Sequence, residues 1–168
     1  MVWRLNPADM SVKSHSFGPN KMIEIKTSDW IIYTDEWLID KIYKARAAKL
    51  PNETGGVLVG SFDMQRRIVY IMDTLLSPPD SKEWPAVYIR GCQGLAQKMK
   101  EIGDKTLGRL EYVGEWHSHP EKSSCLPSGD DKQAFIWLAD MRRPDGLPAI
   151  MLIAGDKKKY AFYLGTMS

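Results

Sequence analysis

The chain has 168 residues, of which 43% are hydrophobic and 26% are charged, as is usual for a soluble globular protein of one domain. The formal net charge of +2 is too small to indicate nucleic-acid binding, and the basic run 157–159 is interpreted as a solvated hairpin turn. No apolar run approaches the ~20 residues that span a bilayer, and the first residues lack the apolar middle of a signal peptide. Two cysteines in unrelated contexts indicate no disulfide framework, so we expect a reducing, cytoplasmic setting.

The first third of the chain predicts an arm, a strand, a helix and the start of a hairpin. Residues 1–28 contain polar and turn-forming residues without periodicity, which predicts a loose N-terminal arm before a domain over 29–168. The stretch "WIIYTDEW" predicts a short strand and then a helix, which is capped by Thr34 or Asp35 and ends at Pro51. Two β-rich runs, "ETGGVLVGSFD" and "RRIVYIMDTLLS", predict an antiparallel hairpin.

The rest of the chain alternates helices with strands. A polar loop, "PPDSKEWP", precedes a helix predicted over 91–103, and "LEYVGEWHSH" alternates as a strand does. A third helix is predicted over 130–141, and "AIMLIAG" with "KYAFYLG" predicts a closing hairpin. Because strands interleave with helices while several neighbours pair as hairpins, the fold class is α/β, a mixed, mostly antiparallel sheet flanked by helices.

Two of the three histidines, His117 and His119, are one residue apart at the end of a predicted strand. Side chains of a strand alternate between its faces, so both imidazoles are expected on one side, with Ser118 facing away. Pro120 stops the strand because it has no backbone N–H. This pair favours a divalent metal, and catalytic zinc needs three protein ligands plus an open water position.

An acid at the start of the third predicted helix is the candidate for the third ligand. In "SGDD", Ser128 is a good helix cap and Asp131 follows three residues later, as in a capping box. Asp130 and Asp131 also complement the helix dipole, but beside the histidine pair an acid fixed at a helix start is a rigid ligand. A zinc-activated water also needs a proton acceptor. Glu53 is either this base or a solvated loop acid, because periodicity alone does not bring it to the histidines.

Three segments in chain order, "ETGGVLVG", "GEWHSHP" and "PSGDD", resemble the JAMM motif of the JAB/MPN metalloproteases. That motif consists of a distant Glu, then His-[Ser/Thr]-His-Pro, then Ser-x-x-Asp. The resemblance covers roughly residues 30–164 in the order of its elements. It implies a JAB/MPN-like, cytidine-deaminase-like sandwich and a metallopeptidase or isopeptidase.

Carried over residue by residue, the resemblance implies one zinc ion per chain, held by His117, His119 and Asp131 with water as fourth ligand. Glu53 is then the general base, which takes the proton of the water and passes it to the leaving amine. Ser128 helps to stabilise the oxyanion. Zinc lowers the pKa of a bound water to roughly 7 and polarises the scissile carbonyl, which agrees with these roles.

The spacing between the motif's second and third segments departs from the family pattern. The usual spacer between the second His and the Ser is seven residues, whereas residues 120–127 make eight here. Alignment of "PSGDD" selects Ser128 and Asp131, while strict counting selects Asp130 and puts Pro127 at the serine position. We prefer Asp131, because proline has no hydroxyl and insertions settle in loops, and Asp130 remains the alternative.

The wording "YVGEWHSHP" and Arg90-Gly91 looks most like the bacterial members encoded beside ubiquitin-like E1 and E2 proteins, including those of CBASS-type antiphage operons. Such members resemble deubiquitinases that cleave the bond after the C-terminus of a ubiquitin-like or conjugated protein. The resemblance implies such a protein tail as substrate, E1- and E2-like proteins of the same operon as partners, and a role in antiviral defence. No nucleic acid and no membrane are expected as partners.

Two rival functions and two further features stay open. A non-catalytic MPN-type scaffold is disfavoured because such relatives usually lose motif residues. A RadC-like, DNA-associated protein is disfavoured because that group tends to show His-Asn-His-Pro. Cys125 is interpreted as a small loop residue, since a fourth protein ligand would close the catalytic position. Residues 77–91 form either a flap over an extended substrate tail or a simple connection.

Overall fold

The structure is a computed structural model that describes residues 2–5, 12–15, 21–27 and 29–166. Its helices are α1 (Glu36–Lys49), α2 (Leu95–Lys105), α3 (Gly129–Arg142) and the short 3-10 helix η1 (Arg143–Asp145). Its strands are β1 (Val2–Leu5), β2 (Val12–His15), β3 (Met22–Lys26), β4 (Ile31–Asp35), β5 (Gly55–Asp63), β6 (Ile68–Leu76), β7 (Lys82–Trp84), β8 (Val87–Ile89), β9 (Glu111–Ser118), β10 (Ala149–Ala154) and β11 (Tyr160–Gly165).

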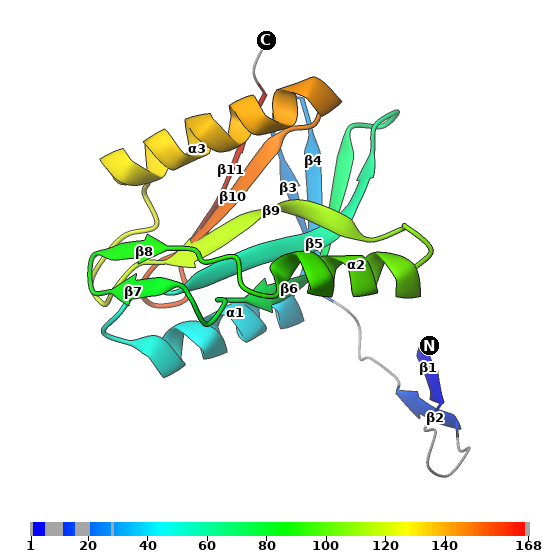
Figure 1. Cartoon of the computed structure of the whole chain (residues 1–168), viewed down its shortest axis with the longest axis horizontal. Helices are drawn as coiled ribbons and strands as arrows, with labels where there is room; N and C mark the ends of the chain where they lie inside the picture. Colours follow the sequence, from blue (N-terminus) through cyan, green and yellow to red (C-terminus); the bar gives the residue numbers. More distant parts are fainter. Residues whose placement is uncertain (1, 6–11, 16–20, 28, 167–168) are drawn as a thin grey trace.

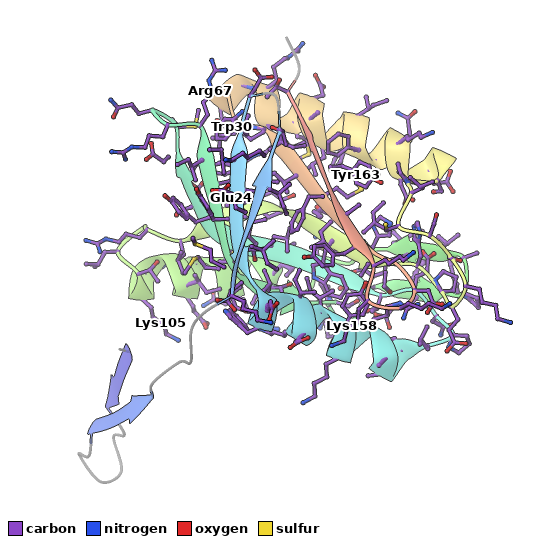
Figure 2. All side chains as sticks on the ribbon, turned by 180° about the vertical axis from the view of Figure 1, so that it is seen from behind. Glu24, Trp30, Arg67, Lys105, Lys158 and Tyr163 are labelled. Carbon is purple, nitrogen blue, oxygen red and sulfur yellow. The ribbon has the colours of Figure 1, made fainter. Side chains whose placement is uncertain are left out.

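Within these described residues, seven strands form the main sheet in the order β11-β10-β9-β5-β6-β4-β3. The β9–β10 and β4–β6 pairs are parallel, and the other neighbours are antiparallel. The sheet is strongly twisted, and α1 and α3 lie on opposite sides of it (Figure 1). Figure 2 shows the reverse view, with Glu24 on β3 and Tyr163 on β11, the two edge strands. The expected mixed, mostly antiparallel α/β fold is confirmed.

Helix α1 begins where an aspartate caps it, and its apolar side supplies much of the core. The Asp35 side chain accepts a hydrogen bond of 3.0 Å from the Trp37 N–H, which resolves the cap left open between Thr34 and Asp35. Leu38 and Ile42 of this helix are fully buried against the sheet. They pack into one cluster with residues of β4, β5, β6, β9 and β10. Burial of this face against the sheet therefore fixes the position of α1.

Alternation along β10 divides the core between the two faces of the sheet. Ile150 and Leu152 belong to the main cluster with α1, whereas Ala149 packs in a second cluster with Leu138 and Ala139 of α3. Successive side chains of a strand point to opposite faces, so the two helices cover opposite faces. The same alternation in β9 sends Trp116 into the α1 core and leaves His117 on the face of α3.

Both predicted hairpins are confirmed. β5 pairs antiparallel with β6, and β10 pairs antiparallel with β11. The basic run 157–159 lies in the turn between β10 and β11, where the Lys159 N–H donates to the Asp156 carbonyl and the Gly155 N–H to the Lys159 carbonyl. The interpretation of this run as a hairpin turn is therefore confirmed.

Two strand regions differ from the prediction. Residues 22–26, expected within the arm over 1–28, form β3 and pair with β4; Ile23 and Ile25 pack on the core between exposed neighbours. The run is only five residues long, so its alternation gave a weak signal. The expected polar loop, residues 78–85, instead contains β7, which pairs as a hairpin with β8 just after it. The division of the chain at residues 28 and 29 remains a prediction.

The second helix begins later than the predicted residue 91. Gly94, at φ 76°, is the N-cap of α2, and the preceding N–H groups of Cys92 and Gln93 donate to the Asp80 carboxylate instead of continuing a helix backwards. Burial is intermediate or absent along most of α2. In the parts of the chain that the structure describes, no helix has the length and apolar character needed to cross a bilayer.

We predict that Leu152→Ala lowers the free energy of unfolding by about 2–5 kcal/mol, because Leu152 is fully buried in the main cluster and truncation leaves a cavity. The matched control is Met72→Ala on β6, which is 51% exposed and is expected to change stability by less than about 0.5 kcal/mol. Urea unfolding followed by circular dichroism measures both. Equal effects of the two substitutions would contradict the assigned core.

Candidate metal centre

Strand β9 delivers both histidines to one side of the sheet. It lies between β5 and β10, with His117 opposite Gly55 and Ile153. The His119 N–H donates to the Ala154 carbonyl at 2.9 Å, so the pairing with β10 continues one residue past the strand. The Nε2 atoms of His117 and His119 lie 3.3 Å apart, and both residues are only 8% exposed. Ser118, between them, is fully buried, and its Oγ accepts from the N–H of Thr54, which directly precedes β5.

The start of α3 brings a carboxylate to the same point. Ser128 caps the helix: its Oγ accepts from the Asp131 N–H at 3.1 Å, and its own N–H donates to Asp131 Oδ2 at 2.6 Å. This capping box holds the Asp131 side chain back over the helix start. Asp131 Oδ1 lies 3.0 Å from His117 Nε2, and Oδ2 lies 3.2 Å from His119 Nε2. Asp130 is exposed and lines the adjoining groove.

The three side chains fit a tetrahedral metal ion. Their nearest nitrogen and oxygen atoms are 3.0, 3.2 and 3.3 Å apart. Zinc bonds of ~2.0–2.1 Å at tetrahedral angles separate ligand atoms by ~3.3 Å. His119 Nδ1 lies 2.7 Å from the Ser124 carbonyl oxygen, which can only accept, so Nδ1 carries a proton and Nε2 is the ring atom left to coordinate a metal. Within the described residues, these three side chains form the group that could hold a metal ion.

Burial and the histidines set the charges in the cluster. Burial disfavours the Asp131 carboxylate, but hydrogen bonds from His117 and His119 outweigh it and hold the pKa of Asp131 well below its usual value. The hydrogen bond to Asp131 raises the pKa of His119. Burial raises the pKa of Glu53, against the opposing attraction of the two histidines. An ionised Asp131 and a more basic Glu53 suit a ligand and a proton acceptor, respectively.

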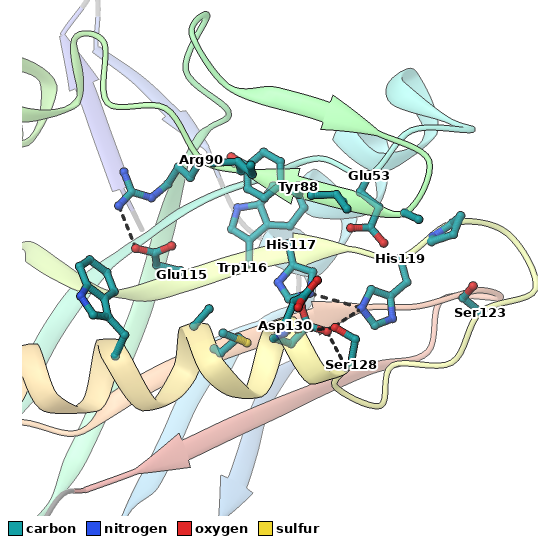
Figure 3. Close-up of a pocket in the computed structure, with 18 residues that line it drawn as sticks. Glu53, Tyr88, Arg90, Glu115, Trp116, His117, His119, Ser123, Ser128 and Asp130 are labelled. Carbon is teal, nitrogen blue, oxygen red and sulfur yellow. Dashed lines mark hydrogen bonds and ion pairs between the residues drawn. The ribbon is translucent and has the colours of Figure 1, made fainter.

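Glu53 reaches the histidines through tertiary structure. It immediately precedes β5, is 8% exposed, and its carboxylate points toward the space beside His117 and His119 (Figure 3). Its N–H donates to the Trp84 carbonyl of β7 at 2.9 Å. The structure thus brings together Glu53, both histidines and Asp131, and Ser128 lines the same cavity.

A groove of about 720 Å³ extends away from this cluster. Its floor is β9, one wall is the β8 side of the β7–β8 hairpin, and the other wall is α3 with Ala134 and Trp137 (Figure 3). Beyond Trp116, Arg90 crosses from the hairpin to the floor, where its Nη2 lies 3.0 Å from Glu115 Oε1. The mixture of apolar walls and a polar cluster is typical of a substrate site.

Cys125 lies outside the ligand cluster. It belongs to the loop between the histidines and α3, is partly buried, and its backbone carbonyl accepts from the Tyr163 hydroxyl at 2.9 Å. Its contact with β11 is made by the backbone. This agrees with the interpretation of Cys125 as a small loop residue.

Sequence reasoning missed the residues that fix the loop of the second histidine. Arg46 of α1 is buried, and its Nε donates to the His119 carbonyl at 2.9 Å. Its Nη2 lies 3.8 Å from Asp156, whose N–H donates to the Ser123 carbonyl. These bonds hold the segment whose next carbonyl, that of Ser124, accepts from His119. An arginine at a core position of a helix was the available signal, but no spacing connects it to the histidines.

Comparison with known proteins assigns this arrangement to a family. The model of the prokaryotic homologues of the JAB domain matches residues 35–164. The chain is 34% identical over 149 residues to the CD-NTase/cGAS isopeptidase of Enterobacter hormaechei, a match that covers 87% of this chain and 76% of that protein. The protein of the same name from Escherichia coli is 31% identical over 112 residues, covering 62% of this chain and 63% of that protein. The chain therefore belongs to the prokaryotic JAB family.

One solved structure supports the fold. A solution structure from Desulfitobacterium hafniense superposes with a TM-score of 0.50 at 16% identity, covering 78% of this chain and 80% of that one. The crystal structure of a JAB1/MPN domain protein from Archaeoglobus fulgidus matches with a TM-score of 0.45 at 19% identity, covering 79% and 86%. The expected resemblance to bacterial JAB/MPN proteins linked to CBASS-type systems is confirmed by the family match and the two named relatives.

The choice between the two neighbouring acids is testable by metal content. We predict that Asp131→Ala abolishes near-stoichiometric zinc binding, because its two carboxylate oxygens face both histidines. The matched control is Asp130→Ala, which removes the same group one residue earlier on the exposed side and is expected to keep the zinc. Elemental analysis after dialysis measures both. Loss of zinc in Asp130→Ala with retention in Asp131→Ala would reverse the assignment.

Proposed function

We propose that this protein is a zinc-dependent isopeptidase or peptidase of the JAMM type, which hydrolyses the bond after the C-terminus of a ubiquitin-like or conjugated protein. The observation that carries the proposal is the convergence of His117, His119 and Asp131 with the buried carboxylate of Glu53 at the end of a groove. The two relatives named CD-NTase/cGAS isopeptidase support the reaction class and suggest a conjugated protein as substrate.

In this proposal, the metal ligands, Glu53 and Ser128 each have a separate role in the reaction. Zinc, when bound by the two histidines and Asp131, activates a water and polarises the scissile carbonyl. Glu53 takes the proton of the attacking water at a carboxylate oxygen and delivers it to the leaving amine. Ser128 already accepts from the Asp131 N–H, so its hydroxyl hydrogen is left to donate to the developing oxyanion.

The groove accommodates an extended tail. Among the described residues, β8 pairs only with β7, and the groove runs along the residues of β8. An added substrate strand would satisfy the main-chain groups of this edge and fix its register, with Val87 and Ile89 exposed beside it. Of the two interpretations of residues 77–91, this pose favours a flap over the substrate tail and not a simple connection. A complex with the tail bound away from β8 would contradict this pose.

The biological setting is part of the proposal. E1- and E2-like proteins of the same operon are the proposed partners, the enzyme reverses or processes conjugation in antiviral defence, and it acts in the cytoplasm. The filled and converging motif residues support an enzyme over a non-catalytic scaffold. The family match and the names of the relatives support this function over a RadC-like role with DNA.

Glu53→Gln tests the proposal most sharply. We predict that the zinc-loaded wild-type protein cleaves a CD-NTase fused through its C-terminal residue to a reporter protein. Glu53→Gln keeps the shape of the side chain but removes the base, so it is expected to retain zinc and lose at least about a hundredfold in kcat. Gel electrophoresis and mass spectrometry of the products measure the rate and the cleavage point. Unchanged cleavage by Glu53→Gln would remove Glu53 from this role.

The control for that experiment is His117→Ala, which is expected to lose zinc and activity together. If the zinc-loaded wild-type protein cleaves neither this fusion nor fusions of ubiquitin-like proteins, the proposed substrate class is wrong. Cleavage that persists after complete removal of zinc by a chelator would contradict the zinc-dependent mechanism.

A further inference from the structure

Thr54 connects three parts of the site. Its carbonyl accepts from the Ser118 N–H at 2.7 Å, and its N–H donates to Ser118 Oγ at 3.0 Å, so it is joined twice to the residue between the two histidines. Its hydroxyl donates to Glu83 Oε1 of β7 at 2.6 Å. Thr54 is 2% exposed and Ser118 is fully buried, so the two bonds between them are shielded from water. One residue therefore links the base, the histidine strand and the hairpin.

Glu83 is a charged anchor on the hairpin. Its second oxygen, Oε2, lies 2.5 Å from Lys49 Nζ at the end of α1. Burial disfavours the carboxylate, but hydrogen bonds from Lys49 and Thr54 outweigh it and lower the pKa of Glu83. The next residue, Trp84, accepts from the Glu53 N–H. The hairpin is thus attached to the base both through its backbone and through this side chain.

The same hairpin forms a wall of the groove and is attached at a second point. Arg90, directly after β8, forms an ion pair with Glu115 on the floor of the groove. Glu115 lies two residues before His117 on β9. Near the base, the Tyr88 ring fills the space beside Gly55, where a Cβ atom would come within 2.3 Å of it. The hairpin is therefore fastened near the base by Glu83 and near the far end of the groove by Arg90.

We propose that Glu83 and Thr54 are positioning residues: the Glu83–Thr54 bond transmits the position of the β7–β8 hairpin to Glu53, so that a protein tail seated against β8 holds the general base in its working place. The inference rests on the proposed function. Neither residue contacts the reacting atoms, and neither lines the groove. Because small displacements of a catalytic group reduce rates steeply, loss of the bond is expected to lower kcat.

The experiment measures kcat and KM for the CD-NTase–reporter fusion with zinc-loaded variants. Thr54→Val removes only the hydroxyl donor, and Glu83→Ala removes the acceptor; each is expected to lower kcat about ten- to a hundredfold with zinc content unchanged. Thr54→Ser, which keeps the hydroxyl, is expected to stay within about threefold of wild type. The double variant Thr54→Val/Glu83→Ala is expected to be no slower than the slower single variant, because both substitutions remove the same hydrogen bond.

A second readout does not depend on activity. Hydrogen exchange of the Glu53 N–H reports its bond to the Trp84 carbonyl, and Thr54→Val and Glu83→Ala are expected to speed this exchange at least about tenfold. The matched controls lie on the same hairpin. Arg90→Met breaks the far attachment and is expected to raise KM more than it lowers kcat, whereas Lys82→Ala on the exposed side is expected to leave exchange and kinetics unchanged.

The outcomes separate the inference from the proposed function. A wild-type protein that does not cleave overturns the proposed function, and the exchange data then still decide whether the bond ties the hairpin to Glu53. Active wild type with Thr54→Val and Glu83→Ala at wild-type kcat overturns the inference. A fall in kcat without faster Glu53 exchange also overturns it. If Thr54→Val does not fold, Glu83→Ala with Glu83→Gln, which keeps an acceptor for Thr54, gives the same comparison.

Discussion

The antiparallel pairing of β5 with β9 is the constraint on which the site depends. It places Gly55 opposite His117. Glu53, two residues before Gly55, therefore lies beside the histidine pair. The two hydrogen bonds between Thr54 and Ser118 hold the two strands together at this point. Glycine is required at residue 55, because a Cβ atom would lie 2.4 Å from the Trp116 carbonyl. A slip of register here would separate the proposed base from the proposed metal ligands.

The start of α3 serves structure and chemistry with the same atoms. Asp131 Oδ2 both accepts the Ser128 N–H of the capping box and faces His119. A helix cap has little rotamer freedom, so the proposed metal ligand is held in place before any metal binds. The cap thus explains how an acid on a separate element, after an eight-residue loop, returns to the strand with the right geometry.

Local patterns predicted a large part of the fold and of the site. Alternation along residues 111–118 predicted that both histidines lie on one side of a strand, and the Ser-x-x-Asp spacing predicted the helix cap at Ser128 with Asp131. Glu53 could be selected only by family resemblance, because its approach to the histidines depends on strand pairing across 64 residues. β3 and the β7–β8 hairpin were missed since runs of three to five residues carry little periodicity. The roles of Thr54, Glu83 and Arg46 rest on contacts between elements, which no local pattern encodes.

X-ray absorption at the zinc edge of the purified protein tests the proposed centre most directly. Zinc held by His117, His119, Asp131 and water gives only nitrogen and oxygen neighbours at ~2.0–2.1 Å, with the outer-shell scattering of two imidazole rings. A sulfur neighbour at ~2.3 Å, which would place Cys125 or Cys92 on the metal, would contradict the account. So would the scattering of a single imidazole, because β9 would then not present both histidines to one ion.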